Sequence, residues 1–431
     1  MRVAIAGYGM EGEVSYHYYA QRGDEVVVLD EREHLDRAVP GGAQVVLGAR
    51  AFEGLDTYDL VIRTPALPPR KLVDARKVWS ATNEFFAQCP APIIAVTGTK
   101  GKGTTSSLIA HILRMAGHTV HLLGNIGTPA LEILPKVTAD DIVVFEISSF
   151  QLWDLERSPH VAVVLMVEPD HLDVHADFDE YISAKSNVRR HQTSEDVCIY
   201  HPTNTHSSQI AHTSVEGTLT RYRTNDVGSV SAENGQFVVD GHVICSIDAL
   251  QLVGEHNIEN ACAAITAARV YTQNDDAIAE GLRGFTGLPH RLQLVREHND
   301  ILYYNDSYSS APGATIAALK SFTQPVVLIA GGYDKHTGYD ELASVIAQLP
   351  NVKRVCLIGQ TRERIARALD AAGFDRYELH DDQVLEPVFA RAVAIAEAGD
   401  VVLLSPGCAS FDMFANFTDR GQQFCKLVEA L

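Results

Sequence analysis

Apolar residues in this 431-residue chain gather in short runs, separated by longer segments with helical spacing. The runs from Val161 to Val167 and from Val326 to Ala330 contain only apolar residues, which is typical of strands buried on both faces of a parallel sheet. The segment from Thr104 to Met115 instead places its apolar residues three and four positions apart, which indicates a helix. This alternation recurs along the chain and predicts an α/β protein with doubly wound sheets.

Two proline-containing connectors, at residues 89–92 and 285–291, divide this pattern, and the chain is too long for one typical core. We therefore expect three domains: a Rossmann-like domain over residues 1–90, a P-loop NTPase-like domain over residues 91–289 and a Rossmann-like domain over residues 290–431. Within the central part, residues 228–247 alternate and contain two glycine turns, which predicts a small antiparallel element.

The strongest candidate site is a strand, loop and helix. An apolar run ends at Val96, a helix is expected from Thr104, and the loop between them is rich in glycine, with Gly98, Gly101 and Gly103. Glycines let backbone N–H groups turn toward an anion, a helix start adds about half a positive charge, and Lys102 can reach outer phosphates. The spacing departs from the Walker form, but it predicts nucleotide phosphate binding, with Mg²⁺ on Thr104 or Thr105.

Polar residues also follow the next strands. Glu146 ends the run 142–146, where a carboxylate beside a phosphate loop suits Mg²⁺, although a solvated strand end would also explain it. His171 and His175 are four residues apart, but Leu172 stands where a zinc hydrolase needs glutamate, so we expect a second cation position here. Lys185 lies in an expected helix, and by itself indicates only a solvated helix face.

A second glycine loop, Gly7-Tyr-Gly9-Met-Glu-Gly12, follows the first strand, and Asp30 closes the second strand. This spacing is typical of dinucleotide binding, which leaves an NAD-dependent oxidoreductase as an alternative. Because such a loop binds any diphosphate, the spacing does not decide the ligand.

Polar loops also follow strands in the third part of the chain, at residues 305–307, 331–335 and 405–410, with Arg291 at the preceding connector. Asn257 and Asn260 begin an alanine-rich helix three residues apart, which suits pairing with a base edge, although helix capping explains them equally well. Ligand groups on the loops of three domains indicate an enzyme that closes around its substrates.

Composition limits the partners. Lys and Arg number 35 against 55 Asp and Glu, and the resulting charge of −20 argues against nucleic acid and against anionic membrane surfaces. Seven scattered cysteines without a C-x-x-C pair indicate a reducing compartment, and no signal peptide or run of roughly 20 apolar residues is apparent. We expect a cytoplasmic monomer acting on small molecules.

Together these motifs resemble the Mur ligase family over essentially the whole chain, and most closely the MurD type, which adds D-glutamate to UDP-N-acetylmuramoyl-L-alanine. The resemblance rests on eight ordered segments: 97–102, 124–129, 146–151, 170–173, 287–291, 305–307, 331–335 and 404–412. The sequence departs from the family pattern at Glu11, Gly103, Glu168, Tyr308 and Ala311-Pro312.

The resemblance implies specific roles. ATP would lie on the phosphate loop, formed by Gly98, Thr99, Lys100, Gly101, Lys102, Gly103 and Thr104. Adenine, ribose and phosphate would be held by Asn257, Asn260, Arg291 and Asp306. One Mg²⁺ would bind Thr104 and Glu146, and a second would bind His171 and a carbamate on Lys185. The catalytic set would be Lys102, Glu146, His171 and Lys185.

The substrate residues follow from the same resemblance. The UDP part would contact Gly9, Met10, Glu11, Glu31 and Arg32. The muramoyl part would contact Asn125, Ser148 and Gln151. The incoming amino acid would contact Lys335, Ser410 and Phe417. Within this chemistry, L-glutamate, another acceptor or a folate tail stays open, and a catalytically silent nucleotide-binding protein is an alternative of another class.

Overall fold

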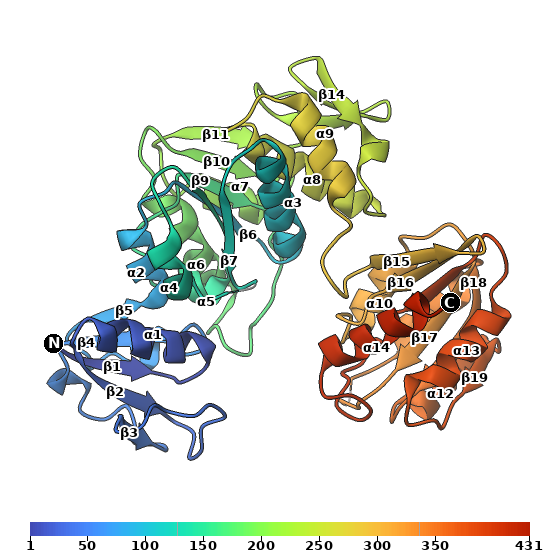
Figure 1. Ribbon diagram of the computed structural model, residues 1–431, viewed down its shortest axis with the longest axis horizontal. Coiled ribbons are helices and arrows are strands. Elements are labelled where there is room, and N and C mark those ends of the chain that lie inside the picture. Colours follow the sequence, from blue (N-terminus) through green and yellow to red (C-terminus); the bar gives the residue numbers. More distant parts are fainter. Residues whose placement is uncertain (127, 336) are drawn as a thin grey trace. The chain divides into compact units, whose positions relative to one another are not determined.

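The computed structural model describes residues 1–126, 128–335 and 337–431. The chain forms two compact units (Figure 1). The first comprises Met1–Ala249 and Ile258–Gly284, and the second comprises Leu250–Asn257 and Phe285–Leu431. Each unit contains strands and helices in alternation, so the predicted α/β class is confirmed.

The first unit begins with a parallel sheet in the order β3-β2-β1-β4-β5. Its strands are β1 (Arg2–Ala6), β2 (Glu25–Asp30), β3 (Gln44–Leu47), β4 (Leu60–Arg63) and β5 (Val78–Ser80). Helix α1 (Met10–Gln21) follows β1 and packs against β1 and β2. The sequence predicted a strand before Gly7 and a second strand closed by Asp30, which β1 and β2 confirm, but it did not predict β3, an exposed edge strand although three of its four residues are apolar.

A second parallel sheet has the order β11-β10-β9-β6-β8-β7. Its strands are β6 (Ile93–Thr97), β7 (Val120–Gly124), β8 (Ile142–Glu146), β9 (Val161–Val164), β10 (Val197–Tyr200) and β11 (Thr218–Arg221). The helices around it are α2 (Ala81–Gln88), α3 (Lys102–Met115), α4 (Ala130–Ile133), α5 (Ser149–Leu152), α6 (Phe178–Arg190), α7 (Thr205–Ala211), α8 (Glu255–Ala268) and α9 (Asp275–Gly284). The predicted antiparallel element is confirmed as β12 (Val230–Glu233), β13 (Gln236–Val239) and β14 (His242–Ser246).

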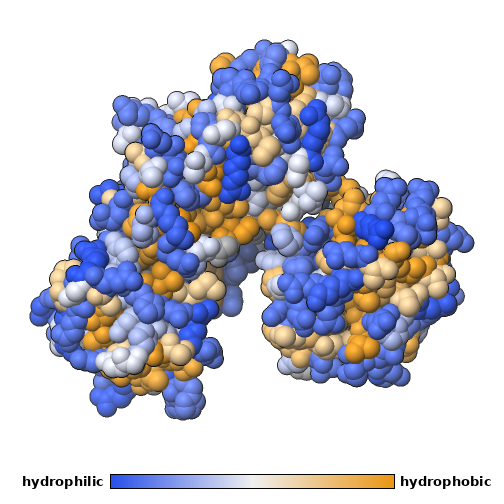
Figure 2. All heavy atoms as spheres, viewed as in Figure 1, coloured by the Kyte–Doolittle hydropathy of each residue, from blue (hydrophilic) through white to orange (hydrophobic). Residues whose placement is uncertain are grey.

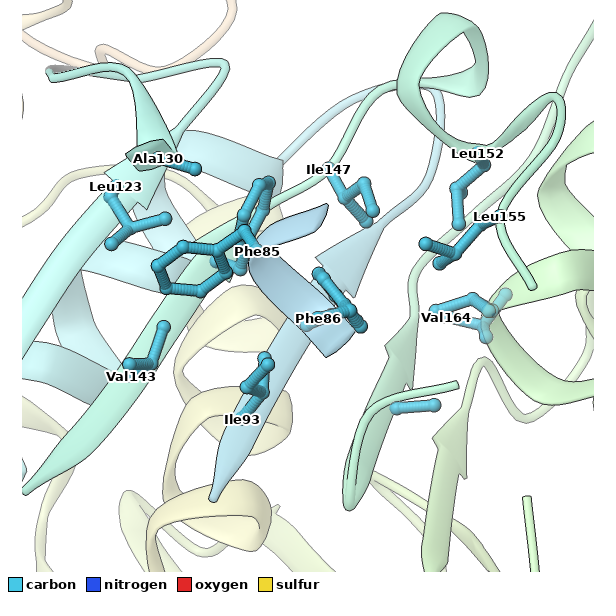
Figure 3. Packing of buried hydrophobic residues seen from close by; sticks show 14 of the residues in the cluster. Phe85, Phe86, Ile93, Leu123, Ala130, Val143, Ile147, Leu152, Leu155 and Val164 are labelled. Atoms are coloured by element: carbon cyan, nitrogen blue, oxygen red, sulfur yellow. The ribbon is translucent and has the colours of Figure 1, made fainter. Parts of the chain in front are cut away.

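Helix α2 supplies two aromatic side chains to the core of this sheet. Figure 3 shows the rings of Phe85 and Phe86 among aliphatic side chains of neighbouring strands, including Ile93 and Val143. Their ring centroids lie 5.8 and 5.4 Å from that of Phe145 on β8. Burying side chains of this size contributes roughly 1.5–3 kcal/mol each. The paired strands β6 and β8 lie against this packing, and both strands end at the candidate site.

The second unit has a sheet in the order β15-β16-β20-β17-β18-β19. Its strands are β15 (Gln293–His298), β16 (Ile301–Asn305), β17 (Val326–Gly331), β18 (Val352–Ile358), β19 (Tyr377–Leu379) and β20 (Val401–Leu404). Its helices are α10 (Pro312–Leu319), α11 (Asp340–Gln348), α12 (Arg362–Ala371), α13 (Leu385–Ile395) and α14 (Phe417–Glu429). Only the β15–β16 pair among these neighbours is antiparallel, which the sequence did not predict.

One helix start was predicted wrongly. Because proline is common at the start of a helix, the position of Pro387 predicts a helix beginning at Val388, but α13 begins at Leu385 and Pro387 is its third residue. Proline is tolerated there because the first turn of a helix leaves its backbone N–H groups without intrahelical acceptors.

Hydrophilic residues cover much of the surface seen in Figure 2, with smaller apolar areas between them. Among the described residues, none of the helices combines the length and the apolar character needed to cross a bilayer.

Candidate active site

The loop between β6 and α3 has the geometry expected of an anion-binding turn. Gly98 and Gly101 adopt φ angles of +151° and +83°, and Gly101 caps the helix. The Lys102 ammonium donates hydrogen bonds to the carbonyl oxygens of Gly98 and Thr99, at 3.1 and 3.0 Å. The lysine is therefore folded over its own loop, where it would meet the outer phosphates of a nucleotide.

Asn260 lies against this loop from α8. A Cβ atom built on Gly101 would be 2.4 Å from Asn260 Oδ1, and the Thr105 hydroxyl lies 3.4 Å from the same oxygen. Asn257 instead donates from Nδ2 to the carbonyl oxygen of Val253, at 2.7 Å. Because α8 begins at Glu255, neither asparagine caps the helix, and the capping interpretation is wrong.

A buried carboxylate stands beside the phosphate loop. Glu146 is paired with Val96 across β8 and β6, and its side chain is buried. Its Oε1 accepts a hydrogen bond of 2.8 Å from Asn125 Nδ2. Thr104, also buried, lies in the first turn of α3, after the loop that follows β6. Glu146 thus ends one strand and Thr104 begins the helix after its neighbour, and the two side chains offer the hard oxygen ligands that Mg²⁺ prefers.

Lys185 is not on a solvated helix face. Only 1% of the residue is exposed, and Nζ donates to Thr97 Oγ1 and to the Gly98 carbonyl oxygen, at 3.2 and 3.0 Å. Burial, followed by the nearby charge of Lys102, holds the pKa of Lys185 well below its usual value. The structure thus places a weakly basic amine directly under the phosphate loop.

The two histidines after β9 have different surroundings. His171 adopts φ of +54° and its ring lies 4.9 Å from that of Phe150, with Asp170 at 3.6 Å. His175 is buried, stacks on Phe150 at 5.3 Å and contacts Ser149 Oγ at 3.0 Å. Within residues 1–126, 128–335 and 337–431, no three His, Cys, Asp or Glu side chains converge as a metal site.

A cavity of about 670 Å³ joins the glycine loop of residues 7–12 to the second sheet. It is lined by all the residues predicted to contact the UDP and muramoyl parts: Gly9, Met10, Glu11, Glu31, Arg32, Asn125, Ser148 and Gln151. These residues come from distant parts of the sequence, and the fold brings them to one cavity.

Hydrogen bonds across this cavity orient its polar residues. Gln151 Nε2 donates to Glu11 Oε1 at 2.9 Å, while Gln151 Oε1 accepts from the Ser148 backbone N–H at 3.1 Å. Burial raises the pKa of Glu11. The Glu11 carboxylate thus has a fixed partner on the opposite wall.

Asp30 forms an ion pair with Arg32. Its two oxygens accept hydrogen bonds from Arg32 Nε at 2.9 Å and Nη2 at 2.8 Å, and from the Tyr8 backbone N–H at 2.8 Å. Although burial opposes ionisation, these bonds lower the pKa of Asp30 to about 2. The carboxylate that would receive a ribose hydroxyl in an NAD site is therefore already engaged, which weakens the oxidoreductase alternative.

In the second unit, Asp306 is buried at the end of β16. Its oxygens accept from the Leu292 backbone N–H at 3.1 Å and from Ser405 Oγ at 2.6 Å. Burial outweighs these bonds and raises the pKa of Asp306 to about 6.

Arg291 and Phe417 lie on either side of Tyr308. The Arg291 guanidinium carbon is 4.2 Å from the Tyr308 ring centroid, and the Phe417 ring meets Tyr308 edge to face at 5.3 Å. Ser410 is buried, whereas Lys335 is exposed. Asn257 also belongs to this unit.

Comparison with known proteins identifies the family. A family model described as the Mur ligase middle domain matches residues 96–268, and one described as Mur ligase, glutamate ligase domain, matches residues 290–408. The UDP-N-acetylmuramoylalanine--D-glutamate ligase of Clostridium novyi (strain NT) is 34% identical, over 100% of this chain and 96% of that relative. The chain belongs to the Mur ligase family.

Other members extend the comparison. The relative of the same name from Acetivibrio thermocellus is 37% identical, with 100% of this chain and 96% of that relative covered. The solved structure of MurF ligase from Thermotoga maritima in complex with ADP has a TM-score of 0.61 and 18% identity, covering 99% of this chain and 94% of that one. At this identity the likeness shows the multi-domain α/β fold that Mur ligases share.

Two arginines of this Mur ligase were missed from the sequence. Arg420, fully buried, donates from Nε to Ser307 Oγ at 2.9 Å and from Nη1 to the Ala409 carbonyl oxygen at 3.2 Å, so it joins two of the predicted ligand loops. Arg63 is also buried, and it binds the carbonyl oxygens of Thr64 and Leu67, which line the cavity. No sequence signal marks either residue, because arginine is usually exposed.

Proposed function

We propose that this Mur ligase joins D-glutamate to UDP-N-acetylmuramoyl-L-alanine, using ATP and an acyl-phosphate intermediate. The observation that carries the proposal is the cavity, because it combines a diphosphate-type glycine loop with the strand ends next to the phosphate loop. The names of the full-length relatives from Clostridium novyi and Acetivibrio thermocellus support the same substrate pair.

The residues divide by substrate. In this proposal residues 1–90 bind the UDP substrate, residues 91–289 bind ATP and residues 290–431 bind the amino acid. The phosphate loop and Lys102 hold the ATP phosphates, while adenine and ribose contact Asn257, Asn260, Arg291 and Asp306. The amino acid contacts Lys335, Ser410 and Phe417. Cytoplasmic location and a monomeric state stay predictions.

The donor sets suit two Mg²⁺ ions. Thr104 and Glu146 would hold the first ion, since both are buried oxygen donors, Glu146 at the end of β8 and Thr104 in the helix after the neighbouring β6. His171 and a carbamate on Lys185 would hold the second. The uncharged amine is the form that adds to carbon dioxide, and the lowered pKa of Lys185 favours that form at neutral pH. When bound, the ions supply positive charge at the transferring phosphate.

The reaction must bring two anions together. In the first step a substrate carboxylate oxygen attacks the γ-phosphorus of ATP, and ADP leaves. In the second step the amine of the amino acid attacks the acyl carbon and loses a proton, and phosphate leaves with the bonding electrons. Two unit charges at about 4 Å repel by roughly 4 kcal/mol at an effective dielectric constant of about 20. Lys102 and the loop N–H groups lower this barrier by holding the phosphate charge in fixed positions.

Phosphate release tests the proposal. We expect release from ATP only when UDP-N-acetylmuramoyl-L-alanine and an amino acid are both present, with D-glutamate far better than L-glutamate. Preference for L-glutamate would move the chain to a related amide ligase. A change in reduced nicotinamide fluorescence on binding, without ATP turnover, would instead support the oxidoreductase.

The carbamate has a separate test. Lys185→Ala should abolish turnover, and added acetate should partly restore it by supplying a carboxylate at the same place. Arg190→Ala, which removes an exposed basic residue from the same helix, serves as the control and should keep its activity. Unchanged turnover in Lys185→Ala would remove this role.

A further inference from the structure

Arg63 occupies an unusual position for a charged residue. It is the last residue of β4, and its side chain has 0% exposure. A buried guanidinium is tolerated only when its N–H groups are satisfied and its charge is paired. The contacts of Arg63 therefore show what this charge holds in place.

One side of the guanidinium holds the loop that follows β4. Arg63 Nη1 donates to the carbonyl oxygens of Thr64 at 3.2 Å, Pro65 at 3.3 Å and Leu67 at 3.1 Å. These three residues line the substrate cavity. Arg63 thus fixes the backbone of one cavity wall.

The other side holds helix α5 of the second sheet. Arg63 Nε and Nη2 each donate to Asp154, both at 2.7 Å, and Nη2 also donates to the Phe150 carbonyl oxygen at 2.8 Å. Phe150 lines the opposite wall of the cavity, next to Gln151. Phe150 and Asp154, which lie 87 and 91 positions after Arg63 in the sequence, are therefore joined to β4 through one side chain.

We propose that Arg63 and Asp154 are a positioning pair that sets the separation of the two cavity walls, and thereby the affinity for the uridine-diphosphate sugar substrate. This inference rests on the proposed function of the cavity. The planar fork of arginine is essential to it, because a lysine ammonium cannot reach a carboxylate bidentately and the carbonyl oxygens of both walls at once.

The test compares two buried arginines. Arg189 is also fully buried and also binds backbone carbonyl oxygens, including that of Ala211 at 3.2 Å, but Ala211 does not line the cavity, whereas Thr64, Pro65, Leu67 and Phe150, which Arg63 binds, do. Binding of UDP-N-acetylmuramoyl-L-alanine is measured by calorimetry without ATP or Mg²⁺. We expect Arg63→Lys to weaken binding at least tenfold and Arg189→Lys to weaken it less than twofold, at matched losses of melting temperature. Equal effects of the two variants would overturn the proposal.

A second variant and a second readout separate this inference from the proposed function. Asp154→Asn keeps the side-chain volume but loses the paired charge, and should raise KM for the UDP substrate severalfold while kcat at saturation stays within twofold. Hydrogen exchange should become faster in both residues 64–67 and residues 149–153 of Arg63→Lys. If the wild-type protein does not bind the UDP substrate, the proposed function fails. Unchanged hydrogen exchange in either wall would refute the role of Arg63 and Asp154 as a positioning pair.

Discussion

Substituting Gly101 by alanine probes the phosphate loop most directly. Gly101 has φ of +83°, where a residue with a side chain is strained by about 1–2 kcal/mol. The added Cβ would also stand 2.4 Å from Asn260 Oδ1, so the asparagine must leave its position. Moving a buried side chain off its rotamer costs a further 0.5–1.5 kcal/mol or so. We expect Gly101→Ala to lower the free energy of unfolding by about 2–3 kcal/mol.

Gly117 provides a matched control at the other end of α3. It has φ of +90°, and a Cβ built on it meets no atom within 4 Å. Gly117→Ala should therefore show the backbone strain alone, about 1–2 kcal/mol. The difference between the two variants, measured by urea unfolding, isolates the collision with Asn260. Adding Asn260→Ala to Gly101→Ala should bring the loss back toward the control value.

Nucleotide affinity gives the decisive comparison. Displacing Asn260 and shifting the loop N–H groups should remove the binding free energy of about one hydrogen bond. Gly101→Ala should therefore bind ADP roughly tenfold more weakly, whereas Gly117→Ala should bind ADP as the wild type does. If Gly101→Ala keeps wild-type ADP affinity and loses no more stability than Gly117→Ala, the proposed nucleotide site at this loop is wrong.

Three further outcomes follow from the charges and rings described above. The pKa of Asp30 is lowered to about 2, so the stabilisation that this carboxylate gives is present above its pKa in the unfolded chain and lost as pH falls through 2. Because Arg32 is partly exposed, Asp30→Asn should lower the free energy of unfolding by only about 1–2 kcal/mol at pH 7. This loss of stability should become smaller when unfolding is measured at pH 2–4. The pKa of Asp306 is raised to about 6, so the stability that this group contributes is present below about pH 4 and lost as pH rises through 6. The melting temperature of Asp306→Asn relative to wild type should therefore rise between pH 4 and pH 8, and a constant difference would contradict the raised pKa. Tyr308→Leu removes the ring under Arg291 and should raise KM for ATP two- to fivefold, whereas Tyr308→Phe keeps the ring and should not.

Local sequence determined the elements that carry the chemistry. The strand β6, its glycine loop and the start of α3 lie within about a dozen residues, and each is specified by apolar runs, helical spacing and glycines that short-range sterics alone can interpret. Glu146 was predicted at a strand end for the same reason, and β8 ends there. The strand β3 was missed although three of its four residues are apolar, and the antiparallel direction of β15 was missed because strand direction depends on which distant strand it pairs with.

Tertiary structure alone decided which charges are buried and what they touch. Lys185 could be read from its helix only as a solvated residue, and Arg63 gave no signal, yet both are buried against backbone carbonyl oxygens. Asn260 meets Thr105 across 155 residues of sequence. Periodicity encodes which face of an element is apolar, but not which distant element covers that face, so these contacts and the altered pKa of Lys185 exist only once the chain has packed.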